Sequence, residues 1–148
     1  SIFVGMKTTP LPLYPFGPPT TLPLFSVAVR AGFPSPADDF VEVSLDIREH
    51  LIKHPSATFF ARAEGDSMTG FGIFNGDLLI VDRALQPQHG DVVIAAIDGD
   101  LTCKMLDLHE KLLRSGNVRY QPIELHDNAE LLIEGVVIHS VRHHRCSR

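Results

Sequence analysis

The sequence "DVVIAAIDGDLTCKML", residues 91–106, decides the fold class that we expect. Two apolar runs of strand length flank the pair Asp98-Gly99. An Asp-Gly pair between such runs is a strong signal for a tight hairpin, because both residues tolerate positive φ angles. We therefore predict two antiparallel strands, one over residues 91–98 and one over residues 100–108.

Similar runs recur along the chain from Phe40 onward. Residues 46–54 have helical spacing instead, with Asp46 placed to cap a helix and Pro55 just past its end. We therefore predict a mainly β protein with one or two short helices. The further strands are expected over residues 40–45, 57–64, 77–83, 117–125 and 130–141, the last with a bulge at Gly135.

The first 39 residues differ in composition from the rest of the chain. Eight of the 11 prolines fall within the first 36 residues. Proline fixes φ and lacks an N–H donor, so this segment is expected to be extended and poor in regular structure. We predict a proline-rich N-terminal arm over residues 1–39 and a β-rich domain over residues 40–148. Apolar residues within the arm indicate that part of it lies along the body or across a partner subunit.

Charge and composition exclude several classes of protein. A net charge of −5 argues against broad, unaided binding to a nucleic-acid backbone. No apolar run approaches the roughly 18 residues of a membrane helix, and we expect a cytoplasmic protein that needs no cofactor. The two cysteines are not closely spaced, and reduced thiols are expected. We predict no metal site in the C-terminal tail, where the spacing of His139, His143, His144 and Cys146 fits no standard set of ligands.

Ser67 lies in "AEGDSMTGFGIFNGD", residues 63–77, a segment rich in glycine and acidic residues. A serine hydroxyl becomes a good nucleophile only when a base accepts its proton. None of the eight histidines has a serine-hydrolase context, and the chain has no G-x-S-x-G motif. Asp66 is interpreted as a turn or capping residue rather than as a third catalytic group.

Lys104 is a less usual candidate for the base, because it lies inside the predicted strand over residues 100–108. Strand alternation places it beside Thr102 and Leu106, and the opposite face of the strand is apolar too. Burial would disfavour its charged form, and lowering a lysine pKa from ~10.4 to ~7–8 corresponds to roughly 4 kcal/mol. A neutral Lys104 could then accept the Ser67 proton. The alternative is an edge lysine whose ammonium group reaches solvent.

Five segments carry a resemblance to a known family: "GFPSPADDFVE" (32–42), "HPSATFFARAEGDSM" (54–68), "GDLLIVDRAL" (76–85), "HGDVVIAAIDGDLTCKML" (89–106) and "GVVIHSV" (135–141). Over about residues 23 to 142 the sequence resembles the UmuD-like proteins of the LexA/UmuD self-cleaving serine peptidase superfamily. The resemblance implies a LexA/signal-peptidase-like β-rich catalytic domain. In that family the serine of "GDSM" and a lysine on a later strand form a Ser-Lys dyad, and these positions are Ser67 and Lys104 here.

The resemblance also implies that the substrate is a bond in the same chain. The matching bond joins Ala31 to Gly32 in "VRAGFPSP". Small residues on both sides of this bond reduce the steric hindrance as its backbone approaches a serine. Backbone N–H groups near the nucleophile, with those of Asp66 and Ser67 as candidates, would stabilise the oxyanion.

The implied role is regulation of SOS error-prone translesion DNA synthesis. The implied partners are a second copy of the chain, a RecA nucleoprotein filament and a UmuC-like Y-family polymerase, without direct sequence-specific DNA binding. Three alternatives compete. A LexA-type or phage-type repressor would need an upstream helix-turn-helix, for which 31 proline-rich residues leave no room. A signal peptidase would normally need a membrane anchor. A dimeric interaction module without peptidase activity would not need Ser67 and Lys104.

Overall fold

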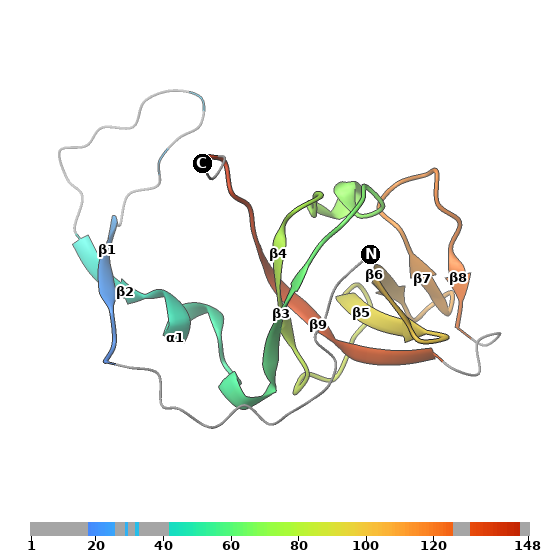
Figure 1. Ribbon diagram of the computed structural model, residues 1–148, viewed down its shortest axis with the longest axis horizontal. Coiled ribbons are helices and arrows are strands. Elements are labelled where there is room, and N and C mark those ends of the chain that lie inside the picture. Colours follow the sequence, from blue (N-terminus) through green and yellow to red (C-terminus); the bar gives the residue numbers. More distant parts are fainter. Residues whose placement is uncertain (1–17, 26–28, 30–31, 33–41, 126–130, 146–148) are drawn as a thin grey trace. The chain divides into compact units, whose positions relative to one another are not determined.

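A computed structural model of the chain describes residues 18–25, 29, 32, 42–125 and 131–145 (Figure 1). The described residues form two compact units, one within residues 11–53 and one within residues 54–148. The boundary that the proline content predicts between arm and domain falls within residues 33–41, outside the described residues. That boundary stays a prediction, and the two units are considered separately.

The smaller unit contains an antiparallel pair of strands that the sequence did not predict in full. Strand β1 (Thr21–Phe25) lies in the proline-rich arm and pairs with β2 (Glu42–Asp46). Pro23 lies inside β1 opposite Ser44. Proline is tolerated in an edge strand, where its missing N–H need not serve a second neighbour. The prediction of little regular structure in the arm is therefore wrong for Thr21–Phe25.

The predicted helix directly follows β2. Helix α1 (Ile47–Leu51) begins after Asp46, whose carboxylate accepts a 3.0 Å hydrogen bond from the backbone N–H of Arg48. This bond satisfies one of the free N–H groups at the helix start and confirms the predicted cap. The helix is shorter than predicted, because the backbone at Ile52 is extended.

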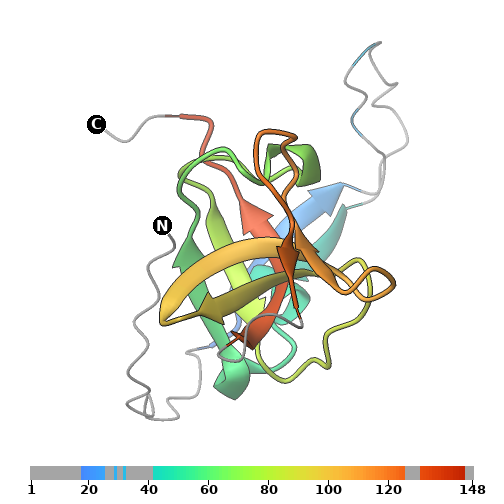
Figure 2. The ribbon, with the colours of Figure 1, turned by 90° about the vertical axis from the view of Figure 1, so that its right-hand side faces the viewer.

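The larger unit contains one seven-stranded sheet, in which every neighbouring pair of strands is antiparallel. The strand order is β3-β4-β9-β5-β6-β7-β8. The sheet is strongly twisted, so β5 and β6 run across the direction of β3 and β4 (Figure 2). This confirms the mainly β fold. The elements are η1 (Pro55–Ala57), β3 (Thr58–Arg62), η2 (Thr69–Phe71), β4 (Leu78–Asp82), β5 (Val92–Ile97), β6 (Asp100–Asp107), β7 (Leu112–Arg114), β8 (Ile123–Glu124) and β9 (Leu131–Val141).

Two local predictions for the sheet are confirmed. Asp98 and Gly99 have φ angles of 50° and 85°, the left-handed geometry of a tight hairpin turn between β5 and β6. Strand β9 is bulged where predicted, since Ile94 pairs with Gly135 but Ala95 pairs with Ile133. A Cβ atom at Gly135 would lie 2.7 Å from Val81 Cγ1, so glycine permits the close approach of β4.

The strand predicted over residues 117–125 is wrong for most of its length, since only β8 forms there. Asn117 closes a turn instead. Its side-chain oxygen accepts from the Arg119 N–H at 3.1 Å, and its carbonyl accepts from the Tyr120 N–H at 3.1 Å. Such local hydrogen bonds compete with strand pairing. The short strand β7 was not predicted.

Both faces of the sheet are buried against apolar side chains. One cluster includes Ile94 and Cys103, and the other includes Val93 and Leu106. Cys103 and Leu106 of β6, which strand alternation places on opposite faces, therefore belong to different clusters. Within the described residues, no helix is long and apolar enough to cross a membrane.

Asp107, at the end of β6, makes stability depend on pH in a predictable way. Its carboxylate accepts hydrogen bonds from the backbone N–H of Glu110 at 2.9 Å and from Arg114 Nε at 2.7 Å, and these lower its pKa to about 2. A lowered carboxyl pKa stabilises the fold above the unfolded pKa of ~3.9, and this contribution is lost as pH falls toward 2. We expect the urea midpoint to fall less between about pH 5 and pH 2 in Asp107→Asn than in the wild type. The exposed control Asp100→Asn should follow the wild type. Parallel curves for the wild type and Asp107→Asn would contradict this assignment.

Candidate active site

Ser67 lies in the segment that connects β3 to β4, residues 63–77, which contains η2 and which we call the serine loop. Two of its side chains anchor this loop to the sheet: Met68 and Ile73 are 3% and 6% exposed and belong to the same apolar cluster as Cys103. The backbone N–H of Ile73 also donates to the Met68 carbonyl at 3.2 Å. The residue after Ser67 is thus fixed by packing and by a hydrogen bond.

Lys104 lies on β6, opposite Val93 of β5, and only 7% of it is exposed. Its Nζ donates to Ser67 Oγ at 3.3 Å and to the Cys103 carbonyl at 3.1 Å. The structure therefore brings together the two side chains that the sequence singled out. Proton transfer needs such contact, and separations are often longer in a resting site than in the reacting complex.

Burial lowers the pKa of Lys104 below its ordinary value of 10.5, because the charged ammonium group loses solvation. A thiolate at Cys103 would oppose this effect. Burial also raises the pKa of the Cys103 thiol, to about 12, so this thiol stays protonated and uncharged near neutral pH. Desolvation therefore decides the direction, and it favours the neutral amine that a general base requires.

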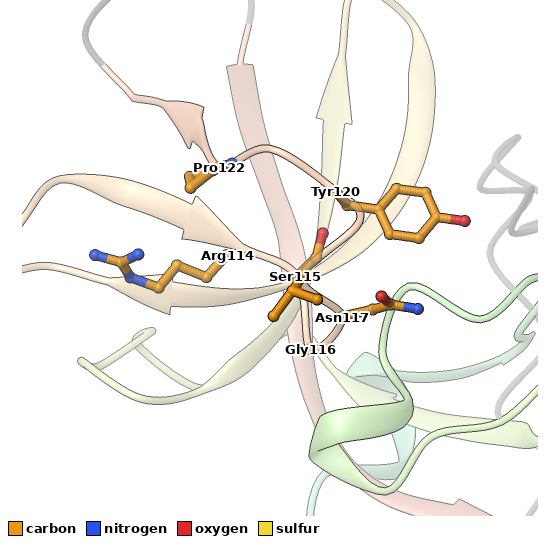
Figure 3. A pocket seen from close by; sticks show the side chains of 7 residues that line it. Arg114, Ser115, Gly116, Asn117, Tyr120 and Pro122 are labelled. Atoms are coloured by element: carbon orange, nitrogen blue, oxygen red, sulfur yellow. The ribbon is translucent and has the colours of Figure 1, made fainter.

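Ser67 opens onto a small cleft of about 110 Å³. A larger hollow, of about 260 Å³, lies along residues 114–122 and is lined by neither Ser67 nor Lys104 (Figure 3). Volume alone would thus select the wrong place. The smaller cleft is lined by Ala63, Glu64, Gly65, Ser67, Met68, Ile73, Leu101, Thr102 and Cys103.

The structure also describes the predicted oxyanion donors and part of the predicted cleavage site. Among the described residues, neither Asp66 nor Ser67 donates its backbone N–H to a main-chain carbonyl, so both remain candidates for an oxyanion hole. The carboxylate of Asp66 accepts from Tyr120 Oη at 2.6 Å. Of the bond predicted to be cut, Gly32 is described and exposed, whereas Ala31 lies outside the described residues.

A model of the family described as "Peptidase S24-like" matches residues 23–138, a range that includes both Ser67 and Lys104. The chain belongs to the S24 peptidase family. This membership confirms the resemblance to the self-cleaving serine peptidase superfamily.

Three of the proteins with a similar sequence are ImpA, SamA and MucA. Protein ImpA of Salmonella typhimurium is 56% identical over 89 residues, which cover 60% of this chain and 61% of ImpA. Protein SamA of Salmonella typhimurium strain LT2 is 50% identical over 93 residues, covering 63% of this chain and 66% of SamA. Protein MucA of Escherichia coli is 38% identical over 126 residues, which cover 84% of this chain and 86% of MucA. The matches thus span just under two thirds of ImpA and SamA, and most of MucA.

Sequence reasoning missed a second segment beside the serine loop. Residues 115–120, which we call the clamp loop, contact the serine loop through Gly116, Asn117 and Tyr120. The local signals were the pair Ser115-Gly116 and Asn117, which are typical of turns. They predict a loop, but not which distant segment the loop contacts.

Proposed function

We propose that this S24 family chain is a self-cleaving serine peptidase. Ser67 is its nucleophile, Lys104 its general base, and the bond between Ala31 and Gly32 its substrate. The observation that carries the proposal is the 3.3 Å contact of a buried lysine amine with a serine hydroxyl. A lysine with a lowered pKa can accept the serine proton, and this makes the serine a good nucleophile.

The reaction is an acyl transfer in which every proton has a place to go. Neutral Lys104 takes the proton of Ser67 Oγ as this oxygen attacks the Ala31 carbonyl carbon. The backbone N–H groups of Asp66 and Ser67 stabilise the oxyanion that forms. Protonated Lys104 then gives its proton to the leaving amine of Gly32. Lys104 then takes a proton from water as the water oxygen attacks the ester on Ser67, and it returns this proton to Ser67 Oγ as the ester bond breaks. The chain is cut once.

The biological role that we propose is regulation of SOS error-prone translesion DNA synthesis. It rests on the resemblance to UmuD-like proteins and on membership of the S24 family. In this role the chain acts in the cytoplasm as a homodimer, and a RecA nucleoprotein filament promotes the cut. The shortened form then serves a UmuC-like polymerase as an accessory subunit.

The rate of self-cleavage is expected to rise with pH. Only the neutral amine is a base, so the rate should follow deprotonation of Lys104, with a midpoint below 10.5 because burial lowers its pKa. Intact-mass measurements over time, between about pH 6 and pH 10, give this profile. RecA filaments on single-stranded DNA should raise the rate at neutral pH, whereas DNA alone should not. A rate independent of pH would contradict the role of Lys104, and a rate unaffected by filaments would contradict the proposed regulation.

A further inference from the structure

The clamp loop and the serine loop are joined by their backbones. The N–H of Gly116 donates to the Ser67 carbonyl at 2.7 Å, and the N–H of Gly70 donates to the Gly116 carbonyl at 2.7 Å. A Cβ atom at Gly70 would collide with that carbonyl oxygen, and one at Gly116 would lie 2.7 Å from Phe71 Cδ2. The two backbones therefore approach so closely that only glycine fits at both positions.

Two side chains of the clamp loop extend this contact to Asp66, the residue before the nucleophile. Tyr120 Oη donates to Asp66 Oδ1 at 2.6 Å, and Asn117 Nδ2 donates to the Asp66 carbonyl at 3.3 Å. Both side chains point to the same side of the loop, whereas Arg114 points to the opposite side (Figure 3). Ser67 is thus held at its own carbonyl, and Asp66 is held at its carbonyl and at its carboxylate.

We propose that Tyr120 is a positioning residue for the nucleophile, which it holds against Lys104 through its hydrogen bond to the Asp66 carboxylate. This inference rests on the proposed function of Ser67 and Lys104. Lys104 lies on a strand of the sheet, whereas Ser67 lies on a loop. The distance between their reacting atoms therefore depends on how firmly the loop is held.

The Tyr120–Asp66 bond is suited to this task. A hydrogen bond to a carboxylate is shorter and stronger than one between neutral groups. The same bond raises the pKa of Tyr120, since ionisation would place two negative charges side by side. The phenol therefore stays a donor to a higher pH than a free tyrosine would. Arg119, 80% exposed at its side chain and 4.0 Å from Asp66, contributes little.

This arrangement assigns Asp66 a role other than catalysis. Among the described residues, its carboxylate contacts Tyr120 and Arg119 and makes no hydrogen bond to Lys104 or Ser67. Its acceptor oxygen matters for positioning, whereas its charge does not take part in proton transfer. The turn-residue interpretation from the sequence is in line with this role.

The test uses the full chain and five variants: Tyr120→Phe, Asp66→Ala, Asp66→Asn, Arg119→Ala and the double variant Tyr120→Phe/Asp66→Ala. Two rates are measured by intact mass, that of self-cleavage and that of Ser67 phosphonylation by a fluorophosphonate. We expect Tyr120→Phe and Asp66→Ala to lower both rates about 10-fold, about 1.4 kcal/mol, at every pH. The pH midpoint should stay in place, because the surroundings of Lys104 are unchanged. The double variant should be no slower than either single variant.

Two variants serve as matched controls. Asp66→Asn keeps an acceptor oxygen for Tyr120 but loses the charge that strengthens the bond, so its rate should lie between those of the wild type and Asp66→Ala. Arg119→Ala should react like the wild type. Wild-type rates in Tyr120→Phe would overturn the proposal. So would a shifted pH midpoint, because Tyr120 would then act on Lys104. A rate in Asp66→Asn as low as in Asp66→Ala would overturn it too, because an acceptor oxygen for Tyr120 would then make no difference. A thermal midpoint lowered in proportion to the lost rate would also overturn it, by making Tyr120 a residue of general stability.

The second rate separates this proposal from the proposed function. If the wild type stays whole but its Ser67 is phosphonylated, the self-cleaving function fails and the labelling rates still decide the role of Tyr120. If Ser67 neither cleaves nor reacts, both proposals fail.

Discussion

Lys104→Met is expected to lower the rate of self-cleavage by about 10³-fold, the typical contribution of a general base. Methionine keeps the apolar stem of the side chain, but its thioether sulfur cannot accept the proton of Ser67. Lys104→Arg should be as slow, because a guanidinium group stays charged and cannot act as a base. Intact mass after incubation at alkaline pH measures the fraction cut.

Stability provides the control for this experiment. Replacing Lys104 by methionine removes an amine that loses solvation on burial, so the urea midpoint at neutral pH should be no lower than in the wild type. The exposed control Lys53→Met should be cut at the wild-type rate. Cleavage of Lys104→Met at the wild-type rate would contradict the assignment of Lys104 as the general base.

Gly32→Val is expected to slow the cut by about 10²-fold while the site stays reactive. The scissile backbone has to come within bonding distance of Ser67, and a misplacement of about 1 Å has an effect of this size. A Cβ atom at Gly32 would meet no heavy atom of the described residues within 4 Å, so valine should be tolerated in the uncut chain. Cleavage is followed by intact mass, and reaction of Ser67 with a fluorophosphonate should keep its wild-type rate.

A matched substitution in the same arm, Gly5→Val, should leave the cut unchanged. A wild-type rate in Gly32→Val would place the scissile bond elsewhere. Loss of both cleavage and labelling would mean that valine had disturbed the site itself.

The elements that the sequence predicted well are those set by local geometry. Asp98-Gly99 specifies a hairpin because both positions need positive φ. Asp46 caps its helix by accepting a hydrogen bond from the backbone N–H of Arg48 in the first turn. Gly135 marks the bulge because β4 comes too close for a side chain there. Each of these signals is contained within a few residues.

The elements that it missed depend on contacts between distant segments. β1 forms around Pro23 only because β2 supplies a partner, and the prediction over residues 117–125 failed because Asn117 turns the chain. At the site, strand alternation predicted a lysine between two apolar faces. The contact of Gly116 with Gly70 could not be predicted in the same way, because it depends on how two loops meet after the sheet has formed.

The most direct test of the account is the mass of the freshly purified chain during incubation at alkaline pH, beside Ser67→Ala. Ser67→Ala removes only the hydroxyl, so the loop and Lys104 should stay in place. Self-cleavage by the Ser67–Lys104 dyad predicts two fragments, residues 1–31 and 32–148, that accumulate in the wild type and are absent in Ser67→Ala. A wild-type chain that stays whole, or a Ser67→Ala chain that yields the same fragments, would contradict it.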